Sequence, residues 1–118
     1  MNLEHIQSII TRFSSERGWE KHHTPKNLVM ALSGEVGELN EIFQWLSEEE
    51  SQNLPDEVRE HTQEEIADIA VYLIRLCMKL DIDLEKAIVD KMAKNEAKYP
   101  IDRVKGMDKK RLFLAKRE

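Results

Sequence analysis

Apolar residues recur along most of the chain at steps of three and four, which is the spacing of one face of an α-helix. No stretch alternates between apolar and polar residues as a half-buried β-strand does. The pattern predicts four helices, over about residues 3–17, 25–47, 56–80 and 84–98. Because the connections are short, we expect an all-α fold, a four-helix and largely antiparallel bundle.

Local signals support these helix limits. Gly18 is a natural terminator for the first helix. Thr24 followed by Pro25 forms an N-cap and first-turn pair for the second helix. Asp83 is the expected N-cap of the fourth helix, and Pro100 ends it. The limits therefore rest on side-chain chemistry as well as on periodicity.

The second half of the third predicted helix, residues 66–80, is apolar around most of its circumference. A surface helix of a small monomer needs only one apolar face. We therefore expect this helix to be central, and we expect the bundle to oligomerise through its central helices. The acidic stretch between the second and third helices, residues 47–55, is interpreted as a solvated loop without function.

Composition and charge narrow the class of protein. The chain has 118 residues, of which 35% are charged and 41% apolar, as expected for one helix-rich domain. Its net charge is −5, with +4 carried by residues 101–118 and −9 by residues 1–100. An acidic body argues against a nucleic-acid surface. We expect a bundle domain over residues 1–100, followed by a short basic tail over residues 101–118.

The single cysteine, Cys77, excludes an internal disulfide framework and a cysteine-based zinc site. It lies in an apolar run, so we interpret it as a small buried residue in a reducing compartment and expect a cytoplasmic protein. No basic leader precedes the first helix. The most apolar run, residues 66–80, contains charges and is shorter than the ~20 residues of a membrane span. We therefore expect no membrane partner.

Four carboxylates break the apolar pattern of the two central helices. Glu35 and Glu38 are three residues apart in the second helix, and Glu65 and Asp68 are three apart in the third. Residues three apart share a helix face, so each helix offers two acids near the core. Unpaired buried carboxylates are unstable by roughly several kcal/mol each. Lys or Arg partners would offset this, but a divalent cation does so better, and hard oxygen ligands suit Mg²⁺ or Mn²⁺.

Two glycines accompany the first pair of acids. Gly34 and Gly37 each weaken a helix interior by ~1 kcal/mol. With Ser33 they form a small-residue patch that would let another backbone approach closely. The alternative interpretation is helix packing beside ordinary surface acids. Two acidic pairs that both border apolar stripes favour the metal site over that alternative.

Two stretches of the chain resemble the MazG-like, all-α nucleoside triphosphate pyrophosphohydrolases, and among them the dCTP pyrophosphatase branch. These stretches are "TPKNLVMALSGEVGELNEIFQW" and "QEEIADIAVYLIRL", and the likeness extends over roughly residues 10–100. The resemblance implies Mg²⁺-dependent cleavage of dCTP, or of a 5-modified relative, to the monophosphate and pyrophosphate. It also implies a homo-oligomer, a dimer or a dimer of dimers. The acids implied as metal ligands and catalytic residues are Glu35, Glu38, Glu65 and Asp68.

The same resemblance implies which residues hold the nucleotide. Trp19, Trp45 and Tyr72 are expected to form an aromatic slot for the base, which suits a pyrimidine. Lys91 and Asn95 are four apart on the inner edge of the fourth helix and are expected to hold phosphate or sugar. The substrate expected from these residues is a deoxynucleoside triphosphate.

Three alternatives remain open at this stage. A non-catalytic helical interaction module with an acidic seam predicts no metal dependence and tolerance of Asp68→Asn. A related pyrophosphohydrolase for dUTP, phosphoribosyl-ATP or a broad range of triphosphates would share the four acids. The base preference is open because some family members carry a histidine near the base at the position of Ile10. A nucleotide sensor without turnover is the third. No protein nucleophile is expected, and Glu41 and Glu64 are the candidates for a general base.

Overall fold

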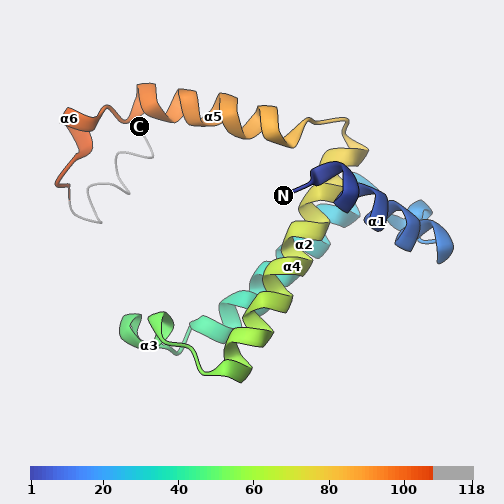
Figure 1. Ribbon diagram of the computed structural model, residues 1–118, viewed down its shortest axis with the longest axis horizontal. Helices are drawn as coiled ribbons and strands as arrows, with labels where there is room; N and C mark the ends of the chain where they lie inside the picture. The colour runs from blue at the N-terminus through green and yellow to red at the C-terminus, as the bar shows by residue number, and fades with distance from the viewer. Residues whose placement is uncertain (108–118) are drawn as a thin grey trace. The chain divides into compact units, whose positions relative to one another are not determined.

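The structure is a computed structural model that describes residues 1–107, and within them every regular element is helical, which confirms the all-α class. The elements are α1 (Leu3–Glu16), the 3₁₀ turn η1 (Glu20–His22), α2 (Pro25–Phe43), α3 (Glu48–Gln52), α4 (Asp56–Lys79), α5 (Leu84–Lys98) and α6 (Ile101–Val104) (Figure 1). The four long helices, α1, α2, α4 and α5, correspond to the four predicted ones.

The chain divides into two compact units. The first unit comprises residues 1–82 and holds α1 to α4, whereas the second begins at Asp83 and holds α5 and α6. In the first unit α2 lies along α4 in antiparallel orientation, and α1 contacts α4 (Figure 1). The predicted basic tail begins with α6, and its last part, residues 108–118, lies outside the described residues. None of the described helices has the length and hydropathy needed to cross a membrane.

The first helix ends in a Schellman motif at Gly18, where the sequence predicts a stop. Gly18 has a φ of 65°, and its N–H donates to the carbonyl of Ser15 at 3.1 Å. The N–H of Trp19 donates to the carbonyl of Ser14 at 3.0 Å. The same turn sets the ring of Trp19 edge-on to that of Phe13, with 5.7 Å between centroids. The helix stop therefore also positions an aromatic side chain beside α1.

The second helix is shorter than predicted, and the acidic stretch after it is not a loop. α2 ends at Phe43, and Ser47 begins α3 with a capping box. The Ser47 hydroxyl accepts from the Glu50 N–H at 3.1 Å, and the Glu50 carboxylate accepts from the Ser47 N–H at 2.9 Å. These bonds satisfy two backbone N–H groups at the start of a new helix. The prediction of a loop over residues 47–55 is therefore wrong, and so is the predicted end of the second helix.

The first unit has a small core and leaves much apolar surface uncovered. Its buried apolar residues are Ile10, Leu28, Ile74 and Cys77, and Cys77 is a free thiol, as predicted. Exposed apolar side chains on α2 and α4 include Val29, Met30, Val36, Ile66, Leu73 and Met78. The apolar circumference predicted for the third helix is thus present, but this chain covers only part of it.

No other backbone in the described part of the chain approaches the small-residue patch. A Cβ added to Gly34 or to Gly37 would meet no atom within 4 Å, and Ser33 is exposed. The close approach predicted for this patch is therefore not made within residues 1–107. The patch lies instead on an open face of α2.

Candidate metal centre and nucleotide pocket

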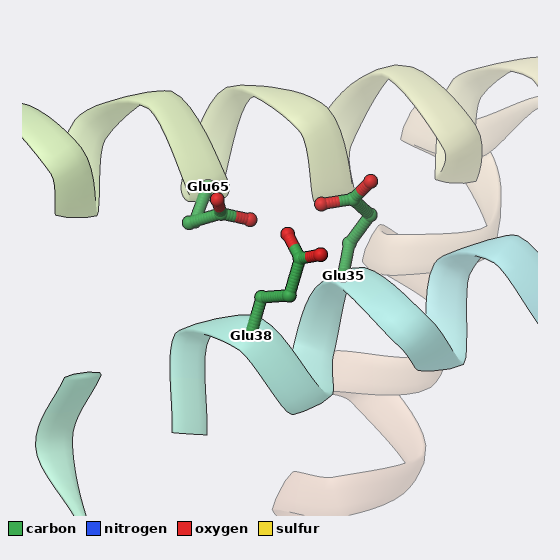
Figure 2. Close-up of side chains that lie close together, drawn as sticks. All are labelled: Glu35, Glu38 and Glu65. Atoms are coloured by element: carbon green, nitrogen blue, oxygen red, sulfur yellow. The ribbon is translucent and has the colours of Figure 1, made fainter. Parts of the chain in front are cut away.

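Three carboxylates meet between α2 and α4 (Figure 2). One oxygen from each of Glu35, Glu38 and Glu65 lies within 4.8 Å of the others. Glu35 and Glu38 are three residues apart and point from α2 toward α4, whereas Glu65 approaches them from α4 (Figure 2). The antiparallel pairing of the two helices thus joins acids that lie far apart in the sequence. We call these three residues the acidic triad.

The acidic triad is partly shielded from water and has little cationic compensation. Glu65 is only 7% exposed, and the Oε2 atoms of Glu35 and Glu65 are buried without a hydrogen-bond partner. Within residues 1–107, the ion pair recorded for these three carboxylates joins His61 Nε2 to Glu65 Oε1 at 3.3 Å. Crowded carboxylates with buried, unpaired oxygens are unstable unless a proton or a cation joins them.

The protonation of Glu35 reflects this crowding. Burial raises the pKa of its carboxyl from an ordinary 4.5 to about 7, and contact with Glu65 together with the charges of Glu38 and Asp68 acts in the same direction. The carboxyl therefore keeps its proton to a higher pH than an ordinary glutamate does. A cation that binds here would have to displace that proton.

Asp68, the fourth predicted ligand, lies outside the acidic triad. It is exposed, one turn along α4 from Glu65, and it lines a cavity together with Glu35. The expectation that Asp68 lies near the core is wrong, because both Asp68 and its apolar neighbour Ile66, which is 53% exposed, lie at the surface of α4. Its role as a ligand stays a prediction, and its position next to Glu35 is compatible with that role.

The donor set of the acidic triad fits a hard divalent cation. All three groups are carboxylates, which Mg²⁺ and Mn²⁺ favour, and two buried oxygens have no partner among residues 1–107. Mg²⁺ is usually held by a few carboxylates and fills its remaining positions with water and substrate phosphate. Glu35, Glu38 and Glu65 are the residues that would hold such an ion.

A cavity of about 350 Å³ extends from the acids along α4. Its lining residues include the acids Glu35 and Asp68, the aromatic residues Phe13, Trp19 and Tyr72, and the cation Arg75. We call it the aromatic cavity. Two of the residues predicted to hold a base, Trp19 and Tyr72, thus line one cavity with two of the predicted metal ligands. A flat ring bound between these side chains would bury apolar surface and stack on aromatic faces.

The other three predicted nucleotide-binding residues lie elsewhere in the chain. Trp45 follows the end of α2, is 86% exposed and does not line the aromatic cavity. Lys91 and Asn95 lie on α5, in the second unit. Lys91 is exposed, and the side-chain amide of Asn95 contacts the sulfur of Met92 at 3.9 Å. Their predicted roles stay predictions.

Three polar or aromatic side chains at the site are absent from the predicted set. Phe13 and Arg75 line the aromatic cavity, and His61 contacts Glu65. Two of them carry a sequence signal. Arg75 is a cation in an otherwise apolar run, three residues after Tyr72, and His61 lies one helical turn before Glu65. Phe13 carries no comparable signal, because it reads as an ordinary core position of the first helix.

Comparison with known proteins gives consistent matches. A sequence model of the MazG-like family matches residues 30–111. The dCTP pyrophosphatase 1 of Mus musculus is 42% identical over 106 residues, and the match covers 88% of this chain and 62% of that protein. For the dCTP pyrophosphatase 1 of Homo sapiens the identity is 42% over 100 residues, covering 83% and 59%. The chain thus spans about three fifths of the length of these curated relatives.

A solved structure is similar over nearly its whole length. The crystal structure of a pyrophosphatase from Archaeoglobus fulgidus matches with a TM-score of 0.80 and 44% sequence identity. The match covers 85% of this chain and 94% of the archaeal chain. The sequence comparison and the structural comparison therefore both match proteins that are named as pyrophosphatases.

Proposed function

Because the chain belongs to the MazG-like family, we propose that it is a Mg²⁺-dependent nucleoside triphosphate pyrophosphohydrolase. Its proposed substrate is dCTP or a 5-modified relative, and its products are the monophosphate and pyrophosphate. The observation that carries this proposal is the acidic triad placed beside an aromatic cavity that residues of α1, α2 and α4 line. The names of the mammalian relatives, dCTP pyrophosphatase 1, support the choice of nucleotide.

Different residues of the chain have different roles in the proposed reaction. Glu35, Glu38 and Glu65 would hold the cation, with Asp68 beside Glu35 at the edge of the aromatic cavity. When bound, Mg²⁺ supplies charge neutralisation for phosphate oxygens and lowers the pKa of an attacking water. The rings that line the aromatic cavity would stack the base and exclude water from it. Glu35, with a pKa of about 7, would exchange a proton near neutral pH.

The proposal is tested by assaying pyrophosphate and orthophosphate release from the common deoxynucleoside and nucleoside triphosphates, with and without Mg²⁺. We expect pyrophosphate release only with the metal, fastest with dCTP or a 5-substituted dCTP. Similar turnover of every triphosphate would favour a broad-range enzyme, and dUTP as the best substrate would favour a dUTP pyrophosphohydrolase. Absence of metal-dependent turnover with all substrates would contradict the proposal and favour the interaction module or a sensor.

Metal affinity should rise with pH through the range in which Glu35 titrates. The raised pKa of Glu35 means that below about 7 its proton competes with the cation. The same raised pKa affects the stability of the metal-free protein. Between about pH 4.5 and 7 the folded protein binds this proton more tightly than the unfolded chain does, so the free energy of unfolding falls as the pH rises through this window. Calorimetric titration with Mg²⁺ at pH 5.5, 6.5 and 7.5 should show tighter binding at each step, with proton release. A constant affinity would contradict the assignment of Glu35 as a ligand.

We also propose that the chain forms a homo-oligomer through α2 and α4, as a dimer or a dimer of dimers, with α5 completing the four-helix bundle. The exposed apolar side chains and the open small-residue patch support this proposal. A second copy would remove the apolar side chains from water, and the small residues would let its backbone approach closely. In the oligomer Lys91 and Asn95 would contact phosphate or sugar. The buried free thiol of Cys77 supports a reducing, cytoplasmic location.

A further inference from the structure

Arg75 is a partly buried cation at the end of the aromatic cavity remote from the acidic triad. Its Nη2 donates to the hydroxyl of Ser14 at 3.0 Å, and Ser14 is only 3% exposed. The Nε of Arg75 is buried and has no acceptor among residues 1–107, and no ion pair with a carboxylate is recorded for this arginine within the same range. A guanidinium held in place and left without an anion is available for an acceptor that the chain itself does not provide.

Along α4, Asp68, Tyr72 and Arg75 follow one another in the same order as the phosphates, the base and the far edge of the base in a nucleotide. Asp68, Tyr72 and Arg75 are spaced by four and three residues, so they share one face of the helix, and all three line the aromatic cavity. At a rise of 1.5 Å per residue, Asp68 and Arg75 are separated by roughly 10 Å along the helix axis. With phosphates near the acids and the base against Tyr72, the far edge of the base would meet Arg75.

The chemistry of the guanidinium then determines which base edge it accepts. Arginine carries only donors, and it pairs best with two adjacent acceptors. Cytosine presents two such acceptors, its ring N3 and its C2 carbonyl oxygen. Uracil and thymine carry a hydrogen on N3, which would face the guanidinium donor to donor. The aliphatic side chains that line the cavity together with Arg75, namely Ile9, Ile10 and Val71, offer no hydrogen bond to compensate.

We propose that Arg75 reads the base, and that it selects cytosine over uracil and thymine by donating to N3 and the C2 carbonyl oxygen. Ser14 is a positioning residue, because its hydroxyl fixes the plane of the guanidinium without reaching the base. The inference rests on the proposed function, since it takes a nucleotide as the ligand of the aromatic cavity. It adds to that function the residue that determines the choice of pyrimidine.

Arg75 also borders a second cavity, which suggests the main competing interpretation. There it lies with Lys79 and the partly buried His23, and the charges of both cations contribute, after burial, to lowering the pKa of that histidine. Such a set of donors would also suit a phosphate group. The two interpretations differ in their dependence on the base: a phosphate ligand makes Arg75 equally important for every nucleotide, whereas base reading makes it important for cytosine alone.

The test is the ratio of kcat/KM for dCTP to that for dUTP, measured in the full chain with Mg²⁺. In Arg75→Met we expect the ratio to fall at least about tenfold, mainly through a higher KM for dCTP. Arg75→Lys should also lose most of the ratio, because an ammonium keeps the charge without two parallel donors. Arg59→Met, at an exposed position of the same helix, is the matched control and should leave the ratio unchanged. An equal loss for both substrates in Arg75→Met, or an intact ratio in Arg75→Lys, would overturn the proposal.

A binding measurement separates this inference from the proposed activity. The affinities of dCMP and dUMP, measured without metal by isothermal titration calorimetry, require no turnover. Wild-type protein should prefer dCMP, Arg75→Met should show no preference, and Ser14→Ala should show a weaker one while keeping Arg75. This pattern supports base reading even if no triphosphate is hydrolysed. Failure to bind dCMP, or an unchanged preference in Arg75→Met, overturns it even if the enzyme is active.

Discussion

Replacing Glu65 by Gln should lower Mg²⁺-dependent pyrophosphate release from dCTP by at least about 100-fold. The substitution keeps the size of the side chain and one oxygen, but it removes a charge from the most buried member of the acidic triad. The cation would then lose one of its anionic ligands and bind phosphate oxygens less effectively. Steady-state kinetics with a pyrophosphate-specific assay measure the effect.

The same variant should be more stable than the wild type in the absence of metal. The Oε2 atom of Glu65 is buried without a partner, next to two other carboxylates, so a neutral amide removes repulsion from the folded state. We expect its Tm to rise by a few degrees in EDTA and to respond little to added Mg²⁺, whereas the wild type should be stabilised by the ion. Glu60→Gln, at an exposed position of α4, is the control and should change neither property. Near-wild-type turnover in Glu65→Gln would show that this residue is not a ligand.

Replacing Trp19 by Ala should raise the KM for dCTP about tenfold or more while changing kcat by less than about threefold. Stacking of a base on an aromatic ring contributes about 1–3 kcal/mol and is similar in the ground and transition states, so its loss is a loss of uniform binding. Trp19 is the ring that the Schellman motif at Gly18 brings into the wall of the aromatic cavity. The two constants come from one substrate titration of each variant.

Trp19→Phe and Trp45→Ala give this prediction its controls. The phenyl ring keeps an aromatic face in the cavity wall, so Trp19→Phe should retain most of the affinity for dCTP. Trp45 is 86% exposed, so Trp45→Ala measures what the second predicted base-binding tryptophan contributes from outside the cavity. A fall in kcat at constant KM in Trp19→Ala would contradict a base-stacking role for Trp19, provided that the Tm shows the variant to be folded.

Much of the fold could be predicted because side chains close in sequence determine where helices begin and end. The left-handed conformation at Gly18 ends α1, the Thr24 hydroxyl accepts from the Asn27 N–H at 3.3 Å, and the Asp83 carboxylate caps α5 by accepting from the Lys86 N–H. The end of α2 was missed for a related reason. The apolar spacing continues past it, and the capping box at Ser47 competes locally with that periodicity.

The candidate site could be predicted only in part, because it depends on how two helices are aligned. The three-residue spacing places Glu35 and Glu38 on one face, whatever packs against them. Whether Glu65 or Asp68 opposes them depends on the register of α4 against α2, and packing rather than local sequence determines it. The proposed role of Arg75 could not be predicted, because a cation in an apolar helix reads as a break in the pattern, whereas its contacts with the Ser14 hydroxyl and the Tyr72 ring become visible only in the structure.

The central claim is that the acidic triad holds a divalent cation, and anomalous diffraction from crystals grown with Mn²⁺ tests it most directly. We expect an anomalous peak between the carboxylates of Glu35, Glu38 and Glu65, within coordination distance of all three. Crystals in which these carboxylates turn away from one another, with no peak between them, would contradict it.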